Sequence, residues 1–161
     1  MENNNTYIFI DLDGVIVTSR QHLSKRLHPK YMSNPFDKKC VNVFNEICDV
    51  IKPIVILSSD WKLHYNIDQL NEIFHDNGMN CIIADTTSCL WGTMFTNFSQ
   101  LEECRAAEIL QYVKEHDIIN FVAIDDLNLT KWIPDRFVRC SRSFEGIKQL
   151  GIKEKIINIL K

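Results

Sequence analysis

Short apolar runs alternate along the chain with segments in which apolar residues recur every three or four positions. The runs predict buried strands, because they are rich in β-branched residues and end in turn-forming or acidic residues. They cover 7–10, 54–57, 81–84, 121–124 and 137–138. The helical spacing predicts amphipathic helices, which cover 40–51, 67–74, 99–116 and 147–160. We therefore expect an α/β fold, a Rossmann-like three-layer αβα sandwich with a mostly parallel sheet.

Several helix ends are marked by particular residues. Pro53 must end the helix over 40–51, because the residue before a proline avoids the helical conformation. Asn77-Gly78 predicts a left-handed stop after the helix over 67–74. Ser99 and Glu102 fit the S-x-x-E capping box, so we expect the next helix to begin there. Its inward-facing residues should be Ile109, Leu110 and Val113.

Two long stretches, 18–37 and 86–98, carry no strand or helix pattern. Loops of this length that follow strands commonly line the ligand crevice of an α/β sheet. Both are too short for a full cap domain, so we expect a capless protein or one with a minimal cap. The stretch 18–37 is a candidate basic flap for a phosphorylated substrate, although a solvated loop would look the same. The basic residues in this stretch and directly after it are Arg20, Lys25, Arg26, Lys30, Lys38 and Lys39.

Composition sets the broad class of the protein. A length of 161 residues, 45% of them hydrophobic, suits a single domain over 1–161. The net charge of −3 neither requires nor excludes a nucleic-acid partner. The six cysteines stand singly, without metal-ligand spacing, so we expect reduced thiols. Because a signal peptide and a membrane span are both missing from the sequence pattern, we expect a cytoplasmic protein without a membrane partner.

Acidic residues follow two of the predicted strands. Asp11 and Asp13 come directly after 7–10, and Asp125 and Asp126 directly after 121–124. In a parallel sheet these carboxylates meet at one edge, where their repulsion favours a hard divalent cation such as Mg²⁺. Along an extended Asp-x-Asp the two side chains share a face, so one can attack a phosphorus atom while the other moves a proton. Single acids at strand ends are also common turn formers, but two such pairs disfavour that interpretation.

Polar residues also follow the strand at 54–57. Ser58 and Ser59 offer hydroxyls and backbone N–H groups that suit a phosphoryl oxygen, although helix-capping serines would look the same. Arg105 lies early in the helix over 99–116, where a cation could steady a phosphate and a nucleophile. A solvated helix charge is the alternative for Arg105.

These residues resemble the motifs of the haloacid dehalogenase (HAD) superfamily. The stretch from Asp11 to Val15, Asp-Leu-Asp-Gly-Val, resembles the first motif. Ser58, after an apolar strand, resembles the second motif, and Ile124-Asp125-Asp126 resembles the fourth. The resemblance implies a magnesium-dependent phosphatase of HAD-like fold.

The resemblance also implies a role for each residue. Asp11 would be the nucleophile that forms an aspartyl phosphate, and Asp13 the general acid and then the general base. Ser58 would bind the phosphate. The magnesium ligands would be Asp11, Asp125 and the backbone carbonyl of Asp13, with Asp126 as an indirect or water-mediated partner.

Within this superfamily the chain is most similar to the small HAD domains of Swiss Army Knife RNA-repair proteins and to polynucleotide 3′-phosphatases. Residues 58–62, Ser-Ser-Asp-Trp-Lys, resemble that group's Ser-Ser-x-Trp-Arg, and 105–109 resembles its R-x-x-E-I stretch. Ser59 and Lys62 are therefore candidate substrate-binding residues. Two departures stand out: Lys62 replaces an arginine, and Arg105 aligns with the third-motif lysine, for which Lys114 and Lys131 are weaker candidates.

The expected substrate is a phosphate end of a nucleic acid, RNA or DNA, or of a nucleotide. A capless crevice favours a large substrate, because the substrate itself can exclude water. Aromatic side chains would then stack on bases. The residues considered for stacking are Tyr31, Phe36, Trp61, Trp91 and Phe95. For Trp91, Phe95 and also Phe98, a place in the core is the alternative.

Three other functions stay open at this point. A phosphatase of small metabolites or phosphoproteins would use the same chemistry. A non-catalytic binding module with the HAD fold is disfavoured because Asp11 and Asp13 are both intact. A receiver domain is disfavoured because its phosphoacceptor ends a middle strand, where this chain has Ser58.

Overall fold

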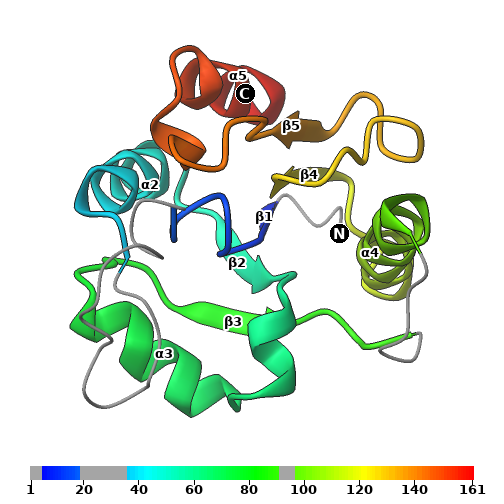
Figure 1. The fold of residues 1–161 in the computed structure, drawn as a ribbon, viewed down its shortest axis with the longest axis horizontal. Coiled ribbons are helices and arrows are strands. Elements are labelled where there is room, and N and C mark those ends of the chain that lie inside the picture. Colours follow the sequence, from blue (N-terminus) through cyan, green and yellow to red (C-terminus); the bar gives the residue numbers. More distant parts are fainter. Residues whose placement is uncertain (1–4, 19–35, 91–96) are drawn as a thin grey trace.

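A computed structural model describes residues 5–18, 36–90 and 97–161 and contains a five-stranded sheet in the order β3-β2-β1-β4-β5 (Figure 1). Each pair of neighbouring strands is parallel. The strands are β1 (Thr6–Ile10), β2 (Ile54–Leu57), β3 (Ile83–Thr86), β4 (Asn120–Asp125) and β5 (Phe137–Arg139). The helices are α2 (Lys38–Ile51), α3 (Ile67–Asp76), α4 (Phe98–Glu115) and α5 (Ile152–Leu160), with 3₁₀ turns η1 (Asp60–Leu63) and η2 (Gly146–Lys148). The predicted α/β fold is confirmed.

Alternate residues of the central strand face opposite sides of the sheet, because side chains in a strand alternate with a period of two. Ile8 and Ile10 belong to the buried cluster that includes side chains of α2, α3 and α5. Tyr7 and Phe9 belong to the second cluster, which contains side chains of α4. The sheet is thus the middle of three layers, as Figure 1 shows.

Phe9 anchors α4 to the sheet. Its ring is fully buried and lies edge-on to Tyr112 of α4 and Phe121 of β4, with centroids 5.6 and 5.7 Å away. Burial of a side chain this large stabilises a fold by about 1.5–3 kcal/mol, and edge-on aromatic pairs add to that. This packing places the first turns of α4 near the carboxyl ends of β1 and β4.

The chain path creates a switch point between β1 and β4. From β1 the chain passes through α2 to β2 and through α3 to β3, with both helices on the same face. Helix α4 then crosses the other face and delivers β4 to the opposite side of β1. In such sheets the carboxyl ends of the strands at the switch point form the ligand crevice. Both predicted acidic pairs lie at the carboxyl ends of these two strands.

The predicted third strand is wrong by two residues. It was expected at 81–84, whereas β3 spans Ile83–Thr86. The side chain of Asn71 accepts from the Ile83 N–H at 2.7 Å and donates to its carbonyl at 3.0 Å, so α3 sets where the strand begins. Ile82 is left outside the strand and 73% exposed.

The start of α4 also differs from the prediction. The N-cap is Asn97, whose side chain accepts from the Gln100 N–H at 3.0 Å, so the capping box at Ser99 is wrong. Glu102 instead accepts from the Asn128 N–H at 3.2 Å. A core position for Phe98 is also wrong, because its side chain is 76% exposed.

The inward face of α4 is shifted from the expected one. Leu110 is exposed, whereas Ile109 and Tyr112 are buried against the sheet. The predicted closing helix over 147–160 is also divided, into η2 and α5. Gly151 at φ 86° separates them, in the left-handed region that a continuing helix cannot use. The stop at Asn77-Gly78 is confirmed, with Gly78 at φ 83°.

Some expectations fall on residues beyond those described. Most of the basic flap and the aromatic residues Trp91 and Phe95 lie in 19–35 and 91–96, outside the described residues. In the part of the chain that is described, no helix has the length and apolar character needed to cross a membrane. The six cysteines are free thiols, as predicted.

Candidate active site

The loop after β1 is a tight turn that places Asp11 and Asp13. The Asp11 N–H donates to the Ile124 carbonyl at 3.0 Å, so Asp11 still lies beside β4. The Leu12 carbonyl then accepts from the N–H groups of residues 15, 16 and 17 at 3.1, 2.9 and 2.8 Å. Gly14 has φ 78°, and a Cβ there would lie 2.5 Å from an oxygen of Asp126. Glycine therefore allows the β1 loop to approach the acid that follows β4.

Three of the four predicted metal-binding acids come together. Asp11, Asp125 and Asp126 each offer a carboxylate oxygen, and these oxygens lie within 4.8 Å of one another. Burial and repulsion from Asp125 raise the pKa of Asp11 to about 7. Burial raises the pKa of Asp125 to about 7, and burial with repulsion from Asp11 raises that of Asp126 to about 6. We call these three residues the acidic cluster; the Asp13 carboxylate is not part of it.

The acidic cluster fits a hard divalent cation. Its donors are carboxylate oxygens, the ligands that Mg²⁺ takes from proteins. A dication between them would relieve the repulsion that raises their pKa values. The predicted ligand role of the Asp13 backbone carbonyl stays a prediction.

Arg105 lies buried against the acidic cluster. Its Nη1 donates to Asp125 Oδ2 and to the Ser58 carbonyl, both at 2.7 Å, and lies 3.4 Å from Asp11 Oδ1. Its Nη2 donates to Asp60 Oδ1 at 3.1 Å. Burial alone would disfavour the charged guanidinium, but Asp125, Asp11 and Asp60 together hold its pKa above the ordinary value. One guanidinium balances only part of the negative charge around it.

Ser58 and Ser59 follow β2 directly and have different surroundings. The Ser58 N–H donates to the Ile10 carbonyl at 2.9 Å, which continues the β1–β2 pairing. Ser59 caps η1 by accepting from the Trp61 N–H at 3.4 Å, and its hydroxyl also bonds to Asp11. Ser58 Oγ is the one buried side-chain polar atom, among the described residues, that has no hydrogen-bond partner. Such an atom is costly unless a ligand satisfies it.

Trp61 and Lys62 both point into the protein. Trp61 Nε1 donates to Asp13 Oδ2 at 3.0 Å, and its ring is buried, so it is not free to stack on a base. Phe36 is buried as well. Lys62 Nζ contacts Glu108 Oε2 at 2.6 Å and Thr87 Oγ1 at 2.9 Å. These contacts of Lys62 therefore hold η1 against α4 and against the loop that follows β3. Substrate binding by Lys62 stays a prediction.

Sequence reasoning missed Glu108 as a partner of Lys62. A signal existed, because Arg105 and Glu108 are three residues apart and so lie on one face of a helix. Both side chains are buried, Arg105 toward the acidic cluster and Glu108 toward Lys62. One face of α4 thus makes two buried ion pairs, Arg105 with Asp125 and Glu108 with Lys62.

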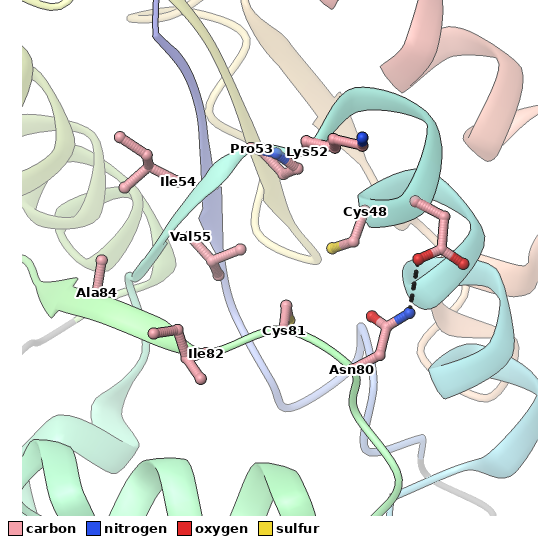
Figure 2. Close-up of a pocket in the computed structure, with 10 residues that line it drawn as sticks. Cys48, Lys52, Pro53, Ile54, Val55, Asn80, Cys81, Ile82 and Ala84 are labelled. Carbon is pink, nitrogen blue, oxygen red and sulfur yellow. Dashed lines mark hydrogen bonds between the residues drawn. The ribbon is translucent and has the colours of Figure 1, made fainter.

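A pocket of about 220 Å³ opens at the acidic cluster. It is lined by Asp11, Asp13, Asp60, Phe98, Leu101, Arg105, Asp126 and Leu127. A larger cavity of about 430 Å³ lies where β2 and β3 begin, at the amino ends of these strands and so away from the acidic cluster (Figure 2). Its one acid, Asp49, accepts from Asn80 at 2.8 Å. The chemistry therefore belongs to the smaller pocket, at the switch point.

The site can be compared with known families. Residues 7–149 match the family described as the HAD domain in Swiss Army Knife RNA repair proteins. The chain belongs to this family. No curated protein and no solved structure matches the chain. The matched range of this HAD domain contains the acidic cluster, Asp13, Ser58 and Arg105, and the family membership supports a HAD-type hydrolase.

Proposed function

We propose that this HAD domain is a Mg²⁺-dependent phosphomonoester hydrolase that works through an aspartyl phosphate on Asp11. The observation that carries the proposal is the meeting of two features at the switch point. The acidic cluster brings its oxygens within 4.8 Å of one another, and the neighbouring strand is followed by Ser58, whose hydroxyl has no hydrogen-bond partner in the described part of the chain. The first feature suits a cation and the second suits a phosphoryl oxygen.

In the first step Asp11 acts as the nucleophile. A carboxylate oxygen of Asp11 forms a bond to phosphorus while the bond from phosphorus to the leaving oxygen breaks. The Asp13 carboxyl gives its proton to that leaving oxygen. Ser58 donates its hydroxyl hydrogen bond to a phosphoryl oxygen. Mg²⁺, held by Asp11, Asp125 and Asp126, would supply positive charge that offsets the charge of the phosphate.

In the second step Asp13 acts as the base. Its carboxylate takes a proton from a water molecule, and the water oxygen forms a bond to phosphorus. The bond from phosphorus to the Asp11 oxygen breaks, which releases inorganic phosphate and restores the carboxylate of Asp11. Asp13 is again protonated and ready for the next cycle.

Arg105 keeps the nucleophile and a metal ligand in place. Its contacts to Asp125, Asp11 and the Ser58 carbonyl connect the end of β4 with the loops after β1 and β2. Because these contacts are buried and two of them are 2.7 Å long, they restrict the three segments to one geometry. We assign Arg105 the part that a lysine has in the third motif of the superfamily.

As substrate we propose phosphate ends of nucleic acids or nucleotides in the cytoplasm. The family's description refers to RNA repair, and the pocket is bounded by core loops and α4. Six free cysteines favour a reducing compartment. Small metabolites and phosphoproteins are the alternative substrates with the same chemistry.

Phosphate release from a panel tests the proposal. The panel holds 3′- and 5′-phosphorylated oligonucleotides, mononucleotides, sugar phosphates, a phosphopeptide and p-nitrophenyl phosphate, each with Mg²⁺ and with EDTA. We expect release that EDTA and the substitution Asp11→Asn both abolish, with the fastest member identifying the substrate class. No release from any member by folded wild-type protein would contradict the phosphatase and favour a binding module.

A further inference from the structure

Trp61 makes a hydrogen bond that reaches the proton-transferring side chain. Its indole Nε1 donates to Asp13 Oδ2 at 3.0 Å, across a sequence separation of 48 residues. We propose that Trp61 is a positioning residue, which orients the Asp13 carboxyl so that its transferable proton lies on Oδ1. This inference rests on the proposed function and adds a residue to its machinery.

The chemistry of indole favours one oxygen of Asp13 as the proton carrier. An indole N–H can donate a hydrogen bond but cannot accept one, so Oδ2 of Asp13 is the acceptor in this bond. In a protonated carboxyl group the carbonyl oxygen is the better acceptor. The bond from Trp61 therefore favours Oδ2 as the carbonyl oxygen and Oδ1 as the oxygen that carries the proton. Asp13 lines the pocket of the acidic cluster, where the leaving group is expected.

The Trp61 ring is itself held firmly. Its side chain is buried, with the Phe36 ring 5.8 Å away at 71° and the Tyr65 ring 5.9 Å away at 43°. The backbone of η1 is held by the cap at Ser59 and by the neighbouring ion pair between Lys62 and Glu108. A rigid donor is what fixes the rotation of a carboxyl group.

The bond also joins two functional loops. Asp13 follows β1 and belongs to the loop of the nucleophile, whereas Trp61 follows β2 and lies three residues after Ser58. A shift of the phosphate-binding loop would therefore move the general acid with it. Proton transfer depends on the distance between donor and leaving oxygen, so this coupling keeps both steps aligned.

The test compares two kinds of leaving group. Trp61→Phe keeps an aromatic ring but removes the N–H, and Trp132→Phe is the matched control, since Trp132 packs on the second cluster away from the pocket lining. An alkyl phosphate, such as a mononucleotide, needs the proton from Asp13 on its leaving oxygen, whereas p-nitrophenolate departs without one. We compare kcat/KM, which reports only the steps up to departure of the leaving group and so leaves out the later hydrolysis that Asp13 assists for both substrates. For Trp61→Phe we expect kcat/KM to fall about tenfold or more on the alkyl phosphate but less than about threefold on p-nitrophenyl phosphate. Trp132→Phe should change neither rate.

Two further measurements separate positioning from general damage. In an Asp13→Asn background, Trp61→Phe should cause no additional loss, because both changes act on the same proton. If Trp61→Phe does not fold, β-(3-benzothienyl)alanine at position 61 keeps the bicyclic shape and removes only the N–H. Equal losses on both leaving groups, or no loss, would overturn the role of Trp61. An inactive wild type would instead overturn the proposed function.

Discussion

Two neighbouring serines show how strongly surroundings separate residues of one type. Ser58 and Ser59 both follow β2, yet Ser59 caps η1 and contacts Asp11, whereas Ser58 Oγ has no partner among the described residues. The sequence identified both as candidate phosphate ligands and could not distinguish them. In an extended backbone successive side chains point to opposite sides, so only the packed structure assigns the roles. The open hydroxyl favours Ser58 over Ser59 as the phosphate ligand that we propose.

Gly14 is a single residue whose lack of a side chain affects both stability and the acidic cluster. Gly14→Ala should destabilise the protein by about 1–3 kcal/mol, because φ 78° is strained for alanine and the new Cβ would clash with Asp126 at 2.5 Å. It should also weaken Mg²⁺ binding by displacing that carboxylate. Denaturant unfolding and titration calorimetry measure the two effects.

Gly151→Ala is the matched control for this change. Gly151 has φ 86°, and a Cβ there would meet nothing within 4 Å. Gly151→Ala should lower the free energy of unfolding by about 1 kcal/mol, because alanine is strained at this backbone conformation, and it should leave Mg²⁺ binding unchanged. Equal Mg²⁺ affinities in both alanine variants would contradict the contact between Gly14 and Asp126.

At the scale of elements, the short η1 turn connects the site to the rest of the molecule. Asp60 contacts Arg105, Trp61 contacts Asp13, and Lys62 contacts Glu108. The sequence singled out this stretch through its resemblance to Ser-Ser-x-Trp-Arg. That resemblance made Lys62 a candidate substrate-binding residue, which stays a prediction. Its contact with Glu108 could not be predicted, because a partner on a distant helix cannot be read from local spacing.

The ion pair between Lys62 and Glu108 gives a prediction about this element. Both side chains are only 7% exposed, so Lys62→Met leaves a buried carboxylate without its partner. We expect this single change to destabilise the protein by about 3–5 kcal/mol. The double variant Lys62→Met, Glu108→Gln should recover most of the loss, because no buried charge remains. Chemical denaturation of both variants measures the difference, and a double variant as unstable as the single one would refute this account.

At the scale of the whole molecule, the reversal of strand order at β1 and β4 creates the site. Helix α4 returns the chain across the sheet, so acids more than a hundred residues apart in sequence end on adjacent parallel strands. The buried cluster this produces is unfavourable by itself, as its raised pKa values indicate. Folding and metal binding are therefore expected to be linked.

This linkage predicts how metal stabilisation depends on pH. Asp11 has a pKa of about 7 in the folded protein against 3.8 ordinarily, so its protonated form stabilises the metal-free fold below about pH 4, and this contribution is lost as pH rises toward 7. Mg²⁺ needs the ionised carboxylates, so the rise in melting temperature on adding Mg²⁺ should grow from pH 5 to 8. At a hundredfold excess over Kd the stabilisation is about 2.7 kcal/mol.

Thermal melts with Mg²⁺ and with EDTA across this pH range measure the effect. Asp126→Asn removes one carboxylate of the acidic cluster and should reduce the rise in melting temperature at every pH. A rise that is constant with pH, or equally large in Asp126→Asn, would contradict binding at this cluster.

The sequence by itself determined the order of elements, the parallel sheet and the edge where the acids meet. These follow from apolar runs of strand length and from acids placed directly after them, which are local patterns. It failed at the start of β3 because the side chain of Asn71, on α3, decides where that strand begins. It failed at the start of α4 because Asn97 competes with Ser99 as the cap, and Glu102, which the predicted capping box needs, binds the Asn128 N–H instead.

Only the tertiary structure decided which side chains meet within the site. It separated Asp13 from the acidic cluster, turned Lys62 toward Glu108 and brought Trp61 to Asp13. The two contacts, Lys62 with Glu108 and Trp61 with Asp13, join residues far apart in sequence, and their geometry depends on how α4 and η1 pack on the sheet. Local spacing specifies which face a residue occupies, whereas packing between elements specifies the atom it contacts.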